Sequence, residues 1–510
     1  MAYLLGLDIG TSGTKTLLID ETGRVVARAL AEYPLSTPRP NWAEQDPAHW
    51  WQATVETIRS VLAQAGVDGA EVSGVGLSGQ MHGSVFLDAQ DQVIRPALLW
   101  CDQRTGAQCD WITATVGRET LVAETCNPVL TGFQAPKIIW LRDNEPENYA
   151  RVRRVLLPKD YIRLLLTGEY ATEVSDASGT SLLNVPQRRW STVVLDKIGV
   201  PREWLPTVYE SPEVSGRITG AAAELTGLRA GTPVVGGGGD QAAGAVGNGI
   251  VDTGVVSSTL GTSGVVFAHL DEPLMDPELR THTFCHAVPG KWHVMGVMLS
   301  AGGSLRWLRD TLCQTEKDMA AESGRDPYEY MTEAAASVAT SEGLIFLPYL
   351  TGERVPYPNP NAKGVFFGLT LRHTKAHMIR AVLEGVALGM RDSFEIMKAL
   401  GTPFRQVRAS GGGARSPLWR QIQADVTGEA HCTINVDEGP AFGVALLAGV
   451  GSGAFASVPE ACAGTISVVD ELLPQAAAVT RYQAYHQLYQ ALYPALVGAF
   501  DQVQALVERE

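Results

Sequence analysis

The tetrapeptide Gly-Thr-Ser-Gly occurs twice in this chain, at residues 10–13 and again at residues 261–264. Each copy lies between two apolar runs, which predicts a β-hairpin with a small, hydroxyl-rich tip. Such a tip presents backbone N–H groups and short hydroxyl donors to an oxyanion such as phosphate. Two tips in two halves of the chain indicate one phosphate chain held from both sides, and a pair of ordinary tight turns is the alternative.

The chain length of 510 residues exceeds what a single hydrophobic core normally supports, so two large domains are expected. Hydrophobic residues make up 45% and charged residues 19%, which is typical of a soluble globular protein. No apolar run reaches the roughly 18 residues that span a bilayer. The first predicted strand begins at Tyr3, which leaves no room for a signal peptide.

The cysteines indicate the cellular compartment of the protein, and the net charge disfavours two classes of binding partner. Seven cysteines without a Cys-x-x-Cys pair indicate reduced thiols in a cytoplasmic protein. The net charge of −15 argues against nucleic acid and against an anionic membrane as partners. A polyphosphate ligand must therefore be bound through backbone N–H groups, a divalent cation and a few basic side chains.

The order of the predicted elements indicates a duplicated α/β fold. A helix is predicted to begin at Pro47 after the cap Asp46 and to end at Gly66. Its apolar face is predicted to consist of Trp51, Val55, Ile58 and Leu62. Residues 72–77 and 84–87 are predicted to form a strand pair, and a long helix near 375–400 is expected to couple the domains. Because the strand–tip–strand pattern begins again near residue 250, we place the domains at 1–250 and 251–510.

Two aspartates lie where a phosphate site needs carboxylates. Asp8 ends the first predicted strand, where it could hold Mg²⁺ against the phosphates, and turn capping is its alternative role. Asp240 follows four glycines at 236–239, whose backbone entropy cost indicates close approach of a ligand. We predict that Asp240 accepts the proton of a substrate hydroxyl during phosphoryl transfer, and capping of the next helix is the alternative.

Four further patterns are weaker. The match to Gly-x-Gly-x-x-Gly at residues 74–79 precedes a predicted strand, whereas a dinucleotide site needs a helix there. The glycine-rich loop at 411–416 is expected to lie against the base or ribose of a nucleotide. The segment with Trp100, Asp102 and Arg104 either borders a sugar pocket or holds an internal Asp102–Arg104 pair. A zinc site is disfavoured for the remaining pattern, which comprises His282, Cys285, His286 and His293.

These motifs together resemble the FGGY family of carbohydrate kinases, over nearly the whole chain. The resemblance is carried by residues 6–12, 237–241, 260–264, 411–416 and 439–443. Within that family, four segments are similar to the branch that phosphorylates D-xylulose: residues 78–83, 157–161, 176–180 and 346–354.

The resemblance implies two actin-like (ribonuclease H-like) α/β domains with a duplicated core, flanking a central cleft. The N-terminal domain would hold the sugar and the C-terminal domain the nucleotide. The implied reaction is ATP-dependent phosphorylation of D-xylulose to D-xylulose 5-phosphate with Mg²⁺, in a cytoplasmic enzyme of xylose catabolism, for which a homodimer is usual. The implied roles are proton acceptor and sugar contact for Asp240, sugar contacts for Met81 and His82, metal binding for Asp8, phosphate contacts for Thr11, Ser12, Gly261 and Thr262, and the adenine pocket for Gly411 and Gly412.

Two alternatives stay open at this point. The first is another kinase of the same family, acting on ribulose, gluconate, glycerol or a less common polyol. The second is a nucleotide switch of the actin-like fold that acts on no sugar. The switch gives no reason for the Met81-His82 pair or for Asp240, so the sequence favours a sugar kinase.

Overall fold

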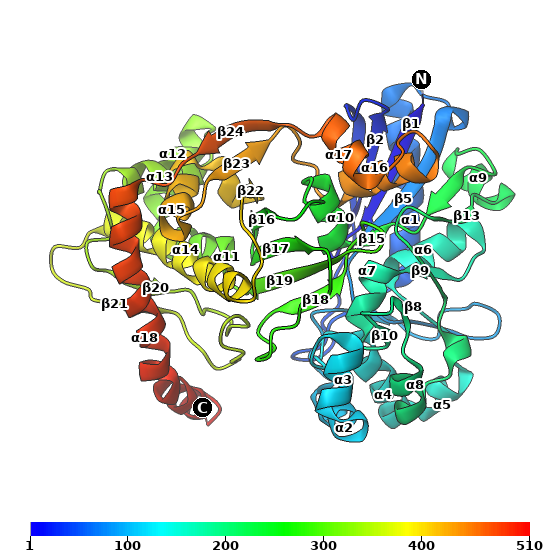
Figure 1. The fold of residues 1–510 in the computed structure, drawn as a ribbon, viewed down its shortest axis with the longest axis horizontal. Coiled ribbons are helices and arrows are strands. Elements are labelled where there is room, and N and C mark those ends of the chain that lie inside the picture. The colour runs from blue at the N-terminus through cyan, green and yellow to red at the C-terminus, as the bar shows by residue number, and fades with distance from the viewer. Residues whose placement is uncertain (1, 510) are drawn as a thin grey trace.

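The computed structural model describes residues 2–509, and the strands of its first half form a seven-stranded sheet (Figure 1). Its order is β13-β14-β5-β1-β2-β3, and β15 also pairs with β5. The strands are β1 (Tyr3–Ile9), β2 (Gly13–Asp20), β3 (Val25–Glu32), β5 (Val72–Gly79), β13 (Val214–Arg217), β14 (Pro233–Val235) and β15 (Gly238–Gly239).

The second half forms a sheet of the same size, in the order β18-β19-β17-β16-β22-β23-β24. Its strands are β16 (Val255–Leu260), β17 (Gly264–Leu270), β18 (His282–Cys285), β19 (Trp292–Met298), β22 (Gln406–Ser410), β23 (His431–Ile434) and β24 (Val468–Leu472). Both predicted hairpins are confirmed, because β1 pairs antiparallel with β2 around one tip and β16 pairs antiparallel with β17 around the other.

The two sheets repeat one plan, which confirms the predicted duplicated α/β fold. In the first, β5 runs parallel to β1 and β14 parallel to β5, and β13 closes the edge antiparallel. In the second, β22 runs parallel to β16 and β23 parallel to β22, and β24 closes the edge antiparallel. The hairpin strands β1 and β2 therefore correspond to β16 and β17.

Helices surround these sheets and fill the connections. In the first half they are α1 (Pro47–Ala65), α2 (Gly106–Val116), α3 (Arg118–Thr125), α4 (Gln134–Asn144), α5 (Pro146–Arg151), α6 (Pro158–Thr167), α7 (Val174–Ala177), α8 (Thr192–Ile198), α9 (Gly220–Thr226) and α10 (Asp240–Gly247). In the second half they are α11 (Gly302–Leu312), α12 (Gln314–Ser323), α13 (Pro327–Ala336), α14 (Lys375–Ala399), α15 (Pro417–Thr427), α16 (Pro440–Gly451), α17 (Val458–Thr465) and α18 (Ala476–Val507). No helix within residues 2–509 is long and apolar enough to cross a membrane.

Helices α10 and α16 pack against each other between the two sheets (Figure 1). A Cβ added to Gly443 would lie 1.9 Å from the carbonyl oxygen of Ala243, so the two backbones are in direct contact. The other side of α16 lies on β1 and β5, which means that the second half covers the first sheet. The domain boundary near residue 250 therefore remains a prediction, because α16 of the second half packs on the sheet of the first half.

Three local expectations need correction. Helix α1 has the predicted caps, but Trp50, Thr54 and Val61 are fully buried whereas Trp51 and Val55 are only partly buried. Strands β5 and β6 (Val85–Leu87) both form but do not pair with each other, because β5 lies between β1 and β14 while β6 pairs with β8 (Arg154–Leu156). Helix α14 packs mainly on α13, α15 and β20 (Ile345–Leu347) of its own half, so α10 and α16 make the contact expected of it.

Candidate active site

A cavity of about 300 Å³ lies between α10 and the strands β16 and β17. Both halves of the chain line it, and the lining includes Lys15, Asp240, Gln241, Thr259, Gly411 and Glu438. Of the predicted site residues, Asp240 and Gly411 are in this wall. The other predicted residues do not line it, namely Asp8, Thr11, Ser12, Met81, His82, Gly261, Thr262 and Gly412.

The glycine run delivers Asp240 to this cavity. Gly237 has a φ of +74°, and a Cβ there would lie 1.9 Å from the carbonyl oxygen of Leu77 in β5. Only glycine fits this close approach, so the chain can turn against β5 before α10 begins. Asp240 is the first residue of α10 and Gly239 occupies the N-cap position, so Asp240 is not the helix cap.

Asp240 and Asp8 form an electrostatically coupled pair of carboxylates. Burial raises the pKa of Asp240 to about 7, and the negative charge of Asp8 adds to that rise. Burial likewise raises the pKa of Asp8 to about 6, against the opposing effects of Ser78 and Lys15. The Oδ1 atom of Asp8 is buried and has no hydrogen-bond partner.

This pair fits a divalent cation. Mg²⁺ prefers carboxylate oxygens and usually takes only one or two of them, with water and substrate phosphates completing its shell. The orphaned Asp8 oxygen supplies such a donor. Within residues 2–509 no group of three or more histidine, cysteine or acidic side chains lies close enough together to hold a metal ion.

Side chains of the first half hold the first tip through hydrogen bonds to Thr11. The Thr11 hydroxyl donates to Gln80 Oε1 at 3.3 Å and accepts a hydrogen bond from the Trp100 indole at 2.9 Å. The Thr11 carbonyl accepts from Gln45 at 2.7 Å. Ser12, by contrast, is exposed. Because the Gly10 N–H already donates to the Gly13 carbonyl oxygen at 3.0 Å, the donors that this tip offers are the N–H groups of Thr11 and Ser12 and the Ser12 hydroxyl.

The second tip lies against the N-terminus of α11. The carbonyl oxygens of Gly261 and Thr262 accept backbone hydrogen bonds from Gly302 and Gly303 at 2.9 and 3.0 Å. Gly411 packs on the base of this tip, since a Cβ there would lie 2.7 Å from the carbonyl oxygen of Leu260. Gly412 is exposed, with open space where a side chain would be. The predicted adenine loop and phosphate tip are thus neighbours.

Met81 and His82 follow β5, whose end pairs with the last glycines before Asp240. Met81 is buried, and its Sδ lies 3.0 Å from where a Cβ on Gly239 would be. His82 has a φ of +69°, its ring stacks on Phe133, and its Nδ1 lies 2.7 Å from the carbonyl oxygen of Gly179. Because a carbonyl can only accept, Nδ1 carries the proton and Nε2 is a free acceptor. Burial lowers the pKa of His82 to about 3, so the ring is neutral.

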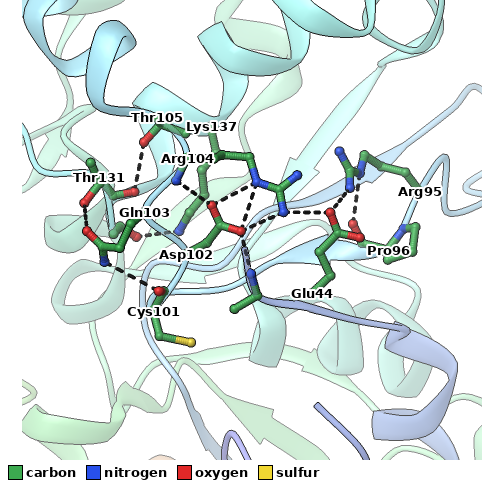
Figure 2. A network of polar contacts seen from close by, with 12 residues as sticks. Glu44, Arg95, Pro96, Cys101, Asp102, Gln103, Arg104, Thr105, Thr131 and Lys137 are labelled. Atoms are coloured by element: carbon green, nitrogen blue, oxygen red, sulfur yellow. Dashed lines mark hydrogen bonds and ion pairs between the residues drawn. The ribbon is translucent and has the colours of Figure 1, made fainter. Parts of the chain in front are cut away.

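Figure 2 shows that Asp102 and Arg104 pair with each other. Arg104 Nη2 lies 2.7 Å from Asp102 Oδ2 and 2.7 Å from Glu44 Oε1, and its guanidinium lies over the Trp42 ring. Asp102 also accepts from the backbone N–H of Ala43 at 2.7 Å. The internal pair is therefore the correct one of the two alternatives, and it anchors the loop from which Trp100 reaches Thr11.

Sequence reasoning missed most of the cavity wall, including Lys15, Gln241 and Glu438. Lys15 lies opposite Asp8 in the β1–β2 register, and its Nζ is 2.5 Å from Glu438 Oε2. Gln241 hydrogen-bonds to Asp240. Lys15 could have been predicted from the sequence, because the register of the hairpin puts it beside Asp8. Glu438 carries no such signal, since only the fold brings it to β2.

Sequence models of one protein family match most of the chain. The sequence model for the N-terminal domain of the FGGY family of carbohydrate kinases matches residues 3–247, and the model for the C-terminal domain matches residues 256–452. The chain is 41% identical to a xylulose kinase of Escherichia coli over 495 residues, which is 97% of this chain and 99% of that protein.

Two further similarities extend the comparison. The crystal structure of xylulose kinase from Rhodospirillum rubrum superposes with a TM-score of 0.89 at 31% identity, covering 98% of this chain and 100% of that one. A gluconokinase of Bacillus subtilis is 33% identical over 428 residues, 83% of each chain.

Proposed function

Because the chain belongs to the FGGY family of carbohydrate kinases, we propose that it transfers the γ-phosphoryl group of ATP to D-xylulose. The observation that carries this proposal is similarity to xylulose kinases over nearly the whole chain. The position of Asp240 in the wall of a cavity lined by both halves of the chain supports it. The product is D-xylulose 5-phosphate, which makes the protein an enzyme of pentose catabolism.

Asp240 is the proposed general base. The oxygen of the sugar 5-hydroxyl attacks the γ-phosphorus, its proton passes to the Asp240 carboxylate, and the bond from the γ-phosphorus to the bridging oxygen of ADP breaks. In a loose transition state the proton moves late, so the orientation of the carboxylate matters more than a high pKa. The contact between Gly237 and β5 supports such a fixed orientation.

On the sugar side, His82 and Met81 are the proposed contacts. The unprotonated Nε2 of His82 accepts a hydrogen bond from a ketose hydroxyl, since Nδ1 is already committed to Gly179. Met81 supplies an apolar wall beside Gly239. Both residues follow β5, directly beside the glycine run that carries Asp240.

On the phosphate side, the proposed donors are the N–H groups in the middle of both tips, including that of Thr11, and the side chains of Ser12 and Thr262. Gly261, whose own N–H donates to the Ser263 carbonyl oxygen at 3.0 Å, is proposed to let the phosphate approach the second tip closely. Lys15 supports this assignment because it is the one cation among the described residues that line the cavity, where Asp240, Asp437 and Glu438 are acidic. Gly411 and Gly412 offer a flat surface to the adenine, since neither has a side chain in the way.

Asp8 is the residue that would hold Mg²⁺, directly or through water, beside the phosphates. The bound cation neutralises charge that develops on the phosphates during transfer. The seven cysteines are all unpaired thiols, which supports a cytoplasmic location. A homodimer is the proposed assembly by analogy with similar kinases.

An ADP-release assay with a panel of sugars tests the proposal. We expect the highest kcat/KM with D-xylulose, and little turnover with ribulose, gluconate or glycerol. Preference for gluconate would move the assignment to the kind of activity named for the Bacillus subtilis relative. Nucleotide-driven assembly without sugar-dependent ADP release would instead indicate a nucleotide switch.

A further inference from the structure

A short segment made of α7 and the 3₁₀ turn η2 (Ser178–Thr180) contacts both sides of the proposed site. The hydroxyl of Ser175 accepts a hydrogen bond from the backbone N–H of Gly239 at 3.1 Å, one residue before Asp240. The carbonyl oxygen of Gly179 accepts a hydrogen bond from Nδ1 of His82 at 2.7 Å. Figure 1 shows α7 next to β15, with which it is in contact. One turn of chain therefore touches the supports of both residues.

Buried charges fix this segment in place. Glu173 caps α7 by accepting from the backbone N–H groups of Ser175 at 2.6 Å and Asp176 at 2.9 Å. Lys159 Nζ lies 3.0 Å from Asp176 Oδ2 and 3.4 Å from Glu173 Oε1. All of these side chains are completely buried. The segment is thus held through charge-assisted contacts rather than by apolar packing alone.

The same cluster also grips the start of the glycine run. The buried guanidinium of Arg163 donates to the carbonyl oxygens of Val235 at 2.5 Å and Gly236 at 2.6 Å. The Arg163 guanidinium also forms an ion pair with Asp160, at 3.6 Å. Asp160 pairs with Lys159 as well, at 2.8 Å. The run that presents Asp240 is therefore held at Gly236 by Arg163 and at Gly239 by Ser175.

Stability alone is a poor reason for such a cluster. Removing a charge from water costs several kcal/mol, and well-packed apolar residues often replace a buried ion pair at no cost in stability. An apolar replacement cannot make a directed hydrogen bond to a particular backbone atom. Arg163 makes such bonds at the start of the glycine run, and Glu173 makes them at the N-terminus of α7. Ser175, which Glu173 holds, makes the bond at the end of the run.

We propose that the α7–η2 segment is a positioning element, in which Ser175 orients Asp240 through Gly239 while Gly179 orients His82. It keeps the proton acceptor and the sugar-binding imidazole at a fixed separation, because both are tied to one rigid turn. Ser175, Glu173 and Arg163 are positioning residues, since none of them lines the cavity. This inference rests on the proposed function, in which Asp240 and His82 act on the sugar.

Ser175→Ala removes the hydrogen bond to Gly239 with the smallest change in volume. We expect kcat for the sugar to fall about tenfold or more, since small misplacements of a reacting group are costly. KM for ATP and the melting temperature should stay close to the wild-type values. The sugar phosphate formed per ADP released should also fall, because a misplaced base lets water compete. This ratio would not respond to a purely structural role.

Thr226→Val is the matched control, because the Thr226 hydroxyl is also buried and also accepts from a backbone N–H, that of Leu228, but it lies in α9 and outside the α7–η2 segment. It should leave kcat, KM and the product ratio unchanged. Wild-type kinetics in Ser175→Ala, or equal losses in both variants, would overturn the positioning role while the proposed function stands. A wild-type protein that phosphorylates no sugar would overturn both.

Discussion

Asp8 and Asp240 lie close enough that the charge of one carboxylate raises the pKa of the other. They come from the end of β1 and the start of α10, at opposite ends of the N-terminal half. The glycine run makes this meeting possible, because it brings the chain against β5, which pairs with β1. A site that gathers negative charge in this way favours a cation between protein and phosphate.

Asp240→Ala should abolish sugar phosphorylation while leaving nucleotide binding largely intact. General-base catalysis contributes roughly 10²- to 10⁴-fold, so kcat should fall by at least that lower figure. Turnover is measured by ADP release and ATP affinity by calorimetry. Near-normal turnover in this variant would show that another group accepts the proton.

Mg²⁺ binding should release protons near neutral pH. The folded-state pKa values of Asp240, about 7, and Asp8, about 6, lie above the ordinary aspartate value, so at pH 6.5 the pair together binds about one proton. A cation needs the ionised forms and displaces that proton, so its affinity should fall as pH drops below 7. Calorimetry of Mg²⁺ binding in buffers of different ionisation enthalpy measures the release. We expect about one proton at pH 6.5 and none at pH 8.5, and Asp8→Asn should weaken binding at both.

Lys15→Met should raise KM for ATP about tenfold and leave KM for the sugar unchanged, because a cation–phosphate contact is worth roughly 1.5–3 kcal/mol. Arg28→Met is the control. Arg28 also pairs with Glu438, at 2.9 Å, but its side chain is 71% exposed and such pairs contribute little. Equal effects of the two substitutions on ATP would mean that Lys15 acts only through Glu438.

The parts of the fold that follow from local sequence could be predicted. Both hairpin tips, the caps of α1 and the glycine run before Asp240 depend on neighbours in the chain, and all are present in the structure. The apolar face of α1 was misjudged by one position, because Thr54 and Thr57 are buried and bond to the helix and to β2. A search for apolar residues at helical spacing overlooks polar side chains that are buried with their hydrogen bonds made inside the protein.

Contacts between distant segments could not be predicted. The pairing of Lys15 with Glu438, the tie between Ser175 and Gly239, and the return of α16 to the first sheet all join residues far apart in sequence. The site was predictable as a set of chemical groups, Asp8, Asp240 and the two tips. Its geometry follows only from the tertiary packing that the cross-domain helices impose.

The close packing of α16 on the first sheet gives a stability prediction. A Cβ on Gly76 in β5 would lie 2.0 Å from the carbonyl oxygen of Val444 in α16. This distance is a steric clash that only a movement of the backbone can relieve. Gly76→Ala should therefore push α16 away from the sheet and lower the free energy of unfolding by about 3 kcal/mol or more. Gly106→Ala is the matched control, because Gly106 is the first residue of α2, exposed, with nothing near its added Cβ. It should be neutral or stabilising by up to about 1 kcal/mol. Thermal and denaturant unfolding of both variants measure the difference, and equal stability would mean that the glycines of β5 are not needed for the contact with α16.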